Sequence, residues 1–280
     1  DKACVPDPYR RFLMHSFIER SLVGLAYAAV WVTSLVYSPN LGYPILLFVI
    51  AFVAAFEMLK LYHIKSLALT TLLCLGAASL LVFNAPLLQI AITSFFCQIG
   101  LAILMFRRKT IQAHPLLASI ICIGHLLFPL LVISEVSIVE SPVFTTEITF
   151  GLLFFIWGVD SMAYSFGTLF GKKPLFRVVS PKKSIEGALA AILLSPMVAL
   201  VNHRIFPDYD FSFWLLMGIV ISITSIVGDL VQSQCKRTAG VKDSGALLLG
   251  HGGVYDRIDS LIFTVPFVYL YLLLFSCYVP

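Results

Sequence analysis

The sequence predicts an all-α polytopic membrane protein with about nine transmembrane helices. Its 280 residues are 59% hydrophobic and 12% charged, with a mean hydropathy of +0.95, whereas soluble domains carry about 25% charged residues. Nine apolar segments come close to the roughly 20 residues that a helix needs to cross the bilayer core. The apolar runs are continuous and do not alternate with polar residues, which excludes a transmembrane β-barrel.

The predicted spans form one integral membrane domain over residues 1–280. They cover residues 21–38, 41–59, 66–83, 85–106, 115–134, 148–170, 185–206, 211–233 and 260–278. Residues 1–150 consist of hydrophobic N-terminal spans with short loops, whereas polar residues gather in residues 151–280. We therefore expect any chemistry to lie in the second half.

Basic residues are biased towards one side of this arrangement. The loops of that side hold all of the nineteen Lys and Arg residues except Arg204. The positive-inside rule places the basic side and the N-terminus in the cytoplasm. Such a face suits anionic headgroups and nucleotides.

Few polar residues lie within the first five predicted spans. Glu57 could be functional, because an acid within a membrane span is a functional candidate. It could equally pair with Lys60, one turn away. His114, which precedes a proline, and His125, within a span, are more simply explained as structural residues. No internal repeat is evident, which argues against an inverted-repeat transporter.

The sixth span carries an aspartate within apolar sequence. Asp160, Tyr164, Gly167 and Gly171 are spaced four, three and four residues apart, so they share one helix face. A small-residue packing face explains the glycines. It does not explain Asp160, because a buried unpaired carboxylate is unfavourable. We therefore expect Asp160 to belong to a site.

The loop before the seventh span reads Ser180-Pro-Lys-Lys-Ser-Ile-Glu-Gly187. Lys182 and Lys183 could simply anchor the span on the positive side. The ordered combination of hydroxyls and lysines favours contact with phosphate, to which Ser180 and both ammonium groups could bind.

Two further charged segments flank the last loop. Asp229, Ser233 and Lys236 share one helix face, and Arg237 follows. Downstream, a Gly-His-Gly-Gly turn at 250–253 could bring backbone amides close to phosphate oxygens. Carboxylates that converge with cations from separate segments suit a Mg²⁺-nucleotide, since hard oxygen ligands hold the metal. A zinc site would require more soft ligands than His251.

Residues 229–259 resemble the signature of the phosphatidate cytidylyltransferase family, also called CDP-diglyceride synthetases. The signature runs Ser-x-x-Lys-Arg, four residues, Lys-Asp, then His-Gly-Gly and Asp-Arg-x-Asp, and the chain matches this spacing. Residues 160–172 and 180–187 resemble two further blocks of the family. Leu249 stands where the family usually has proline, and Ser184 where threonine is common.

The resemblance implies that CTP and phosphatidate react to give CDP-diacylglycerol and pyrophosphate, with Mg²⁺ as cofactor. Residues 151–280 would then be the catalytic half of an enzyme in the cytoplasmic membrane, with its site facing the cytoplasm. Membrane lipids are the expected surroundings, no nucleic acid partner is expected, and a homodimer is compatible with the sequence.

The resemblance also implies roles for individual residues. Asp229 and Asp256 would bind Mg²⁺, with Asp160 as a nearby support. The candidate catalytic residues are Asp160, Asp229, Lys236, Arg237 and Asp256. The candidate substrate-binding residues are Ser180, Lys182, Lys183, Ser233, Lys242, Asp243, His251, Gly252, Gly253, Arg257 and Asp259.

Two other functions fit parts of the pattern. A CTP-dependent polyprenol or lipid kinase would share a basic site at the membrane surface, but it would transfer the terminal phosphoryl group. A transporter would spread ionisable residues along a path to both faces, whereas here they crowd one face.

Overall fold

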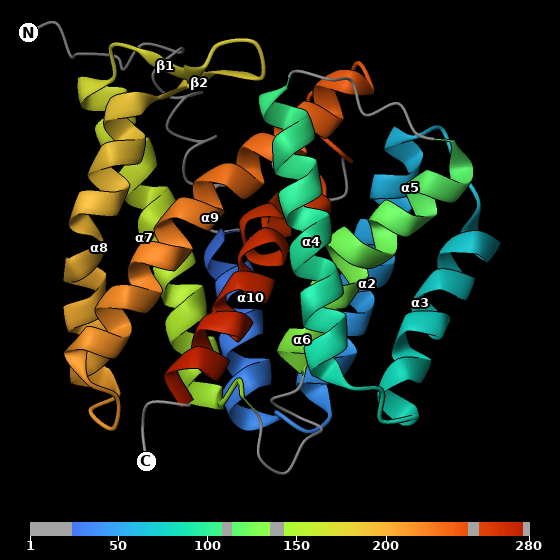
Figure 1. The fold of residues 1–280 in the computed structure, drawn as a ribbon, viewed down its shortest axis with the longest axis horizontal. Helices are drawn as coiled ribbons and strands as arrows, with labels where there is room; N and C mark the ends of the chain where they lie inside the picture. The colour runs from blue at the N-terminus through green and yellow to red at the C-terminus, as the bar shows by residue number, and fades with distance from the viewer. Residues whose placement is uncertain (1–23, 108–113, 135–142, 246–251, 277–280) are drawn as a thin grey trace, which may run out of the picture.

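The computed structural model describes residues 24–107, 114–134, 143–245 and 252–276, which form nine helical spans (Figure 1). The spans are Gly24–Tyr37, α2 (Gly42–Leu61), α3 (Leu67–Val82), α4 (Leu87–Phe106), the continuous segment α5 (Pro115–Ile121), η1 (Cys122–Leu127) and α6 (Phe128–Ile133), α7 (Thr146–Phe170), α8 (Ile185–Ile205), α9 (Phe211–Thr238) and α10 (Tyr255–Ser276). Within these described ranges, seven spans are long and apolar enough to cross a membrane, and Gly24–Tyr37 and α3 are shorter. The predicted all-α polytopic membrane fold is confirmed.

The two helices beside the signature extend beyond their predicted apolar spans. Helix α9 continues to Thr238 instead of ending at residue 233, and α10 begins at Tyr255 instead of residue 260. Hydropathy marks only the apolar part of a helix, whereas backbone hydrogen bonding continues into the polar sequence beyond it. Lys236 and Asp256 therefore lie on helices, which restrict the directions of their side chains.

A short β-hairpin, not predicted from the sequence, connects α7 to α8 (Figure 1). Strand β1 (Pro174–Phe176) pairs antiparallel with β2 (Ser180–Ser184). Ser184 then caps α8, because its Oγ accepts a hydrogen bond from the Gly187 amide at 3.1 Å. Threonine caps helices in the same way, so the serine at this position preserves the cap.

The predicted basic loops meet at one end of the bundle as far as the structure describes them. The Tyr62 hydroxyl, just after α2, donates to Cys235 Sγ of α9 at 3.9 Å, and burial raises the pKa of Tyr62, which keeps that donor protonated. The rings of Phe106 and Phe176 lie 6.2 Å apart, so α4 and the hairpin reach the same end. Arg204 lies near the other end of α8, as the span order predicted.

Helices α7, α8 and α9 pack together on one side of the bundle, and α10 and α4 occupy its centre (Figure 1). The predicted packing role of the α7 glycines is confirmed at its crossing with α8. A Cβ atom on Gly187 would lie 2.9 Å from Gly167 Cα, and one on Gly171 would lie 2.7 Å from Ser184 Oγ. Small residues let the two backbones approach closely.

Gln98 of α4 satisfies two backbone carbonyls that prolines leave without donors. Pro129 and Pro266 have no N–H, so the carbonyls four residues earlier, in His125 and Ile262, lose their helical partners. The Gln98 Nε2 group donates to both, at 3.1 and 3.0 Å. Gln98, which is fully buried, therefore joins α4, η1 and α10 within the core.

The same side chain orients His125. Gln98 Oε1 lies 2.6 Å from His125 Nδ1 and must accept from it, because Gln98 Nε2 is engaged as a donor. His125 Nε2 consequently accepts from the Tyr255 hydroxyl, 3.1 Å away. His125 is thus a structural link from the core to the first residue of α10, as expected from the sequence.

We expect Gln98→Leu to lower the thermal unfolding midpoint of the detergent-purified protein. Each lost hydrogen bond contributes about 1 kcal/mol, and two buried carbonyls are left unsatisfied. Gln89→Leu is the matched control, because Gln89 is exposed on the same helix. Equal midpoints for the two variants would contradict the assigned role of Gln98.

Candidate active site

Four aspartates and two lysines gather at the basic end of the bundle, where α7, α9, α10 and the hairpin meet. We call this group the aspartate–lysine cluster; its members are Asp160, Lys183, Asp229, Lys236, Asp256 and Asp259. All six were candidate site residues in the sequence, and the fold brings them together from four separate elements.

Asp229 of α9 is held on both carboxylate oxygens. Oδ2 forms an ion pair with Lys183 at the end of β2, and Oδ1 accepts from Ser233 Oγ at 3.2 Å. The predicted common face of Asp229 and Ser233 on α9 is therefore confirmed. About 30% of each charged side chain stays exposed, at 31% for Lys183 and 28% for Asp229, so the pair is open to a ligand.

Asp256 lies deeper and is more fully bonded. Its Oδ1 accepts from Lys236 Nζ at 2.7 Å, and its Oδ2 accepts from the amides of Ser244 and Gly253 at 2.9 and 3.0 Å. Its side chain is only 9% exposed. Charge-assisted hydrogen bonds of this kind fix a carboxylate in both position and orientation.

Asp160 and Asp259 add negative charge from the two neighbouring helices. Asp160 Oδ1 accepts from Ser225 Oγ at 3.2 Å, and Asp160 interacts electrostatically with both Lys183 and Asp229. Asp259 interacts with Asp229 and Asp160 in turn. Like charges at this range repel one another unless cations compensate them. The cluster therefore places four acidic side chains beside two lysines.

Two glycines of the last loop, Gly252 and Gly253, let the backbone pack closely around Asp256 and Glu57. Gly252 has a φ of +80°, a conformation that favours glycine. A Cβ atom on Gly253 would collide with Glu57 and Ser244. The Gly253 amide, which we expected to face phosphate, donates instead to Asp256. His251 lies outside the described residues.

Glu57 belongs to the surroundings of the cluster, a role that the sequence left open. Its Oε2 accepts from Ser244 Oγ at 3.1 Å and from the Tyr255 amide at 2.9 Å, and the residue is 6% exposed. The ion pair with Lys60 is not formed, although both residues are described. Glu57 thus ties α2 to the loop and to the start of α10, next to Asp256.

Arg237 has a contact that its motif did not predict. Its Nε donates to the Val179 carbonyl at 3.4 Å, and its Nη1 donates to the Val241 carbonyl at 3.1 Å. Val179 lies in the hairpin and Val241 follows α9. Arg237 therefore connects the hairpin that carries Lys183 to the helix that carries Asp229.

The remaining candidates lie around the cluster. Lys182, Arg237, Lys242, Asp243 and Arg257 are exposed, and Ser180 is half-buried on β2. Sequence reasoning missed Ser225, Ser244, Tyr255 and Gln232, whose Nε2 donates to the Tyr255 carbonyl at 2.7 Å. In the sequence, these four residues are distinguished only as polar residues close to a charged motif.

We expect Glu57→Ala to speed hydrogen–deuterium exchange of the amides in residues 252–256 by about tenfold or more. A hydrogen bond to a charged group contributes about 1.5–3 kcal/mol, and its loss favours local opening. Lys60→Ala, exposed on the same helix, is the control and should leave exchange unchanged. Unaltered exchange in Glu57→Ala would show that Glu57 does not hold this segment.

Sequence comparison relates this chain to known proteins. The chain is 44% identical to the phosphatidate cytidylyltransferase of Staphylococcus saprophyticus, 47% to that of Staphylococcus epidermidis and 42% to that of Staphylococcus aureus. Each alignment covers 120 residues, which are 42% of this chain and 46% of the relative, so less than half of each relative is matched. The sequence model of a protein family, described as "Cytidylyltransferase family", matches residues 18–275 of this chain. Since this match spans nearly the whole chain, the protein belongs to the cytidylyltransferase family.

Proposed function

We propose that this protein transfers the cytidylyl group of CTP to phosphatidate, which yields CDP-diacylglycerol and pyrophosphate. The observation that carries the proposal is the aspartate–lysine cluster at the basic end of a membrane-spanning bundle. A charged cluster there can meet a water-soluble nucleotide and a lipid headgroup together. Family membership and the names of the aligned relatives support this assignment.

In the proposed reaction, a phosphate oxygen of phosphatidate attacks the α-phosphorus of CTP. A new phosphorus–oxygen bond forms while the bond to the β-phosphate breaks, and pyrophosphate leaves with that electron pair. The attacking phosphate is already anionic at neutral pH, so no strong general base is needed. The difficulty is to bring two anions together, and catalysis would consist of positioning and charge neutralisation.

Lys183 and Lys236 would supply positive charge at the reacting phosphates, because each is held beside a cluster aspartate. The exposed Lys182, Lys242 and Arg257 would draw in the outer phosphates of CTP. Arg237 would hold the hairpin and could direct its remaining N–H groups to a phosphate, since a guanidinium has five donors.

The cluster fits Mg²⁺ in its donor chemistry. We propose Asp229 and Asp256 as ligands, with Asp160 and Asp259 adding negative charge nearby. No three His, Cys, Asp or Glu side chains of the described residues form a metal site by themselves. This suits Mg²⁺, which usually takes one or two carboxylates and completes its shell with water and substrate phosphates. When bound, it would neutralise the phosphates and stabilise the charge that develops on the leaving group.

Position-labelled CTP tests the reaction directly. With phosphatidate and the purified protein, label at the α-phosphate should appear in the lipid product, and label at the γ-phosphate should appear in pyrophosphate. A lipid kinase would give the opposite result, with the γ-label in the lipid. Absence of both products under Mg²⁺ would overturn the proposed activity.

We expect Asp229→Asn and Asp256→Asn each to reduce kcat at least about 100-fold. Loss of a metal ligand removes several kcal/mol of charge stabilisation, and each 1.4 kcal/mol corresponds to about tenfold in rate. Asp208→Asn, exposed at the opposite end of the bundle, should retain full activity. Near-normal turnover of either cluster variant would refute its assignment as a ligand.

The cluster should face the cytoplasm, where the nucleotide is available, and the basic end supports this orientation. In a variant without the six native cysteines, we expect Asp208→Cys to react with a membrane-impermeant maleimide in intact cells. Lys173→Cys should react only after permeabilisation. Reaction of Lys173→Cys in intact cells would place the cluster on the wrong side for this function.

A further inference from the structure

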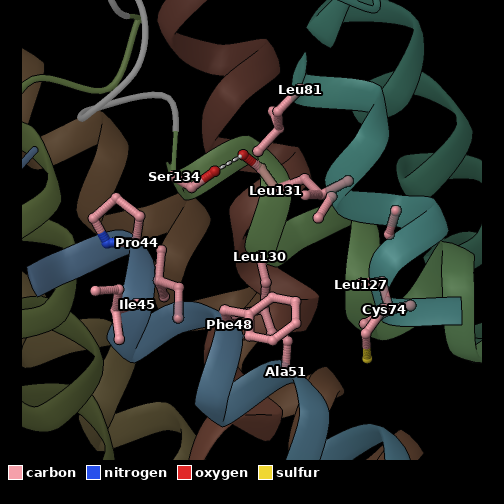
Figure 2. A pocket seen from close by; sticks show the side chains of 13 residues that line it. Pro44, Ile45, Phe48, Ala51, Cys74, Leu81, Leu127, Leu130, Leu131 and Ser134 are labelled. Atoms are coloured by element: carbon pink, nitrogen blue, oxygen red, sulfur yellow. Dashed lines mark hydrogen bonds between the residues drawn. The ribbon is translucent and has the colours of Figure 1, made fainter. Parts of the chain in front are cut away.

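An apolar pocket lies between α2, α3 and the η1–α6 segment, with a volume of about 310 Å³ (Figure 2). Its α2 residues, from Pro44 to Ala51, belong to the N-terminal half of that helix, whereas Glu57 contacts the cluster surroundings from the other half. Ser134, just after α6, lines the same pocket. The pocket is therefore separate from the proposed active site and lies towards the opposite end of the bundle.

Short side chains create this space. Ala51 of α2 and Cys74 and Ala77 of α3 line it, and the larger Leu127 and Leu130 face them from η1 and α6 (Figure 2). Helix α3 packs at the edge of the bundle (Figure 1). Its small residues face inwards, so the described residues leave a gap between α3 and the core.

The lining selects an apolar ligand. All thirteen lining residues except Ser134 are apolar, and none is charged. The Ser134 hydroxyl donates to the Leu131 carbonyl at 2.6 Å (Figure 2), so its O–H group needs no acceptor on a ligand. The pocket therefore offers dispersion contacts rather than polar recognition, and its volume falls in the range of small-molecule sites, about 300–1,000 Å³.

The mouth of the pocket is continuous with the surface that faces lipid. Ile45 and Phe48 line the pocket and are 54% and 41% exposed, and the neighbouring Val49 is 52% exposed. All three lie on α2, which is long and apolar enough to span the membrane. The medium at this mouth is therefore hydrocarbon, and an unfilled apolar gap would forfeit contacts with its lining.

We propose that this pocket binds one hydrocarbon chain of a membrane lipid whose headgroup lies at the end of the bundle opposite the aspartate–lysine cluster. The volume suits a single flexible chain, whereas a helix of a partner protein has a diameter of about 10 Å and would not enter. This lipid would bridge α3 to the core. The inference is independent of the proposed cytidylyltransferase activity.

The test is photocrosslinking in nanodiscs made from a phosphatidylcholine that carries a diazirine within one acyl chain. Residue-level mass spectrometry should find adducts inside the pocket, at Ala77 and Leu130, as well as on the exposed outer face of α3, at Leu72. Ala77→Leu, which fills the pocket, should abolish the adduct at Leu130 and leave the one at Leu72. Ala68→Leu, exposed on the same helix, should change neither.

Ala51→Leu fills the pocket from the other side and should act like Ala77→Leu if the latter folds poorly. Adducts at Leu72 alone in the wild-type protein would overturn the proposal. That result would mean that the pocket is closed, empty or occupied by another part of the chain. An adduct at Leu130 that persists in both filling variants would also overturn it.

Discussion

Charged groups inside a membrane bundle must find their partners within the protein, and this constraint arranges the basic end of the molecule. Asp256 shows it most fully, because one ammonium group and two backbone amides engage both of its oxygens. Those amides belong to Ser244 and Gly253, so the carboxylate also shapes the loop around it. Unpaired, such a charge would be strongly destabilising in a low-dielectric interior.

The same ion pairs connect stability with the proposed chemistry. Lys183 and Lys236 compensate aspartates in the structure and lie where phosphates would bind in the proposed reaction. The two pairs differ in exposure, with Lys183 at 31% and Lys236 at 12%. Lys183 is thus the more accessible of the two to an arriving substrate, and Lys236 the more firmly held. Because the hairpin carries Lys183, its attachment through Arg237 affects both the stability of this end of the bundle and the proposed reaction.

Polar residues deeper in the bundle solve a related problem for the backbone. Gln98 donates to two carbonyls released by prolines, and in α8 Ser195 Oγ donates at 2.8 Å to Ile192, four residues before Pro196. Through His125 the first network reaches Tyr255, whose amide binds Glu57. The core therefore fixes the start of α10, and with it the residue that follows, Asp256.

The sequence by itself determined the helical membrane fold, the order of its spans, the basic end and the acidic and basic members of the cluster, because hydropathy and helix periodicity are local properties. Tertiary structure alone decided that Glu57 binds Ser244, 187 residues away, instead of Lys60. It likewise decided that Arg237 binds the hairpin and that Gln98 donates to the His125 and Ile262 carbonyls on two different helices. Such partners depend on how the helices pack, and a polar side chain accepts whichever donor the packing brings within reach.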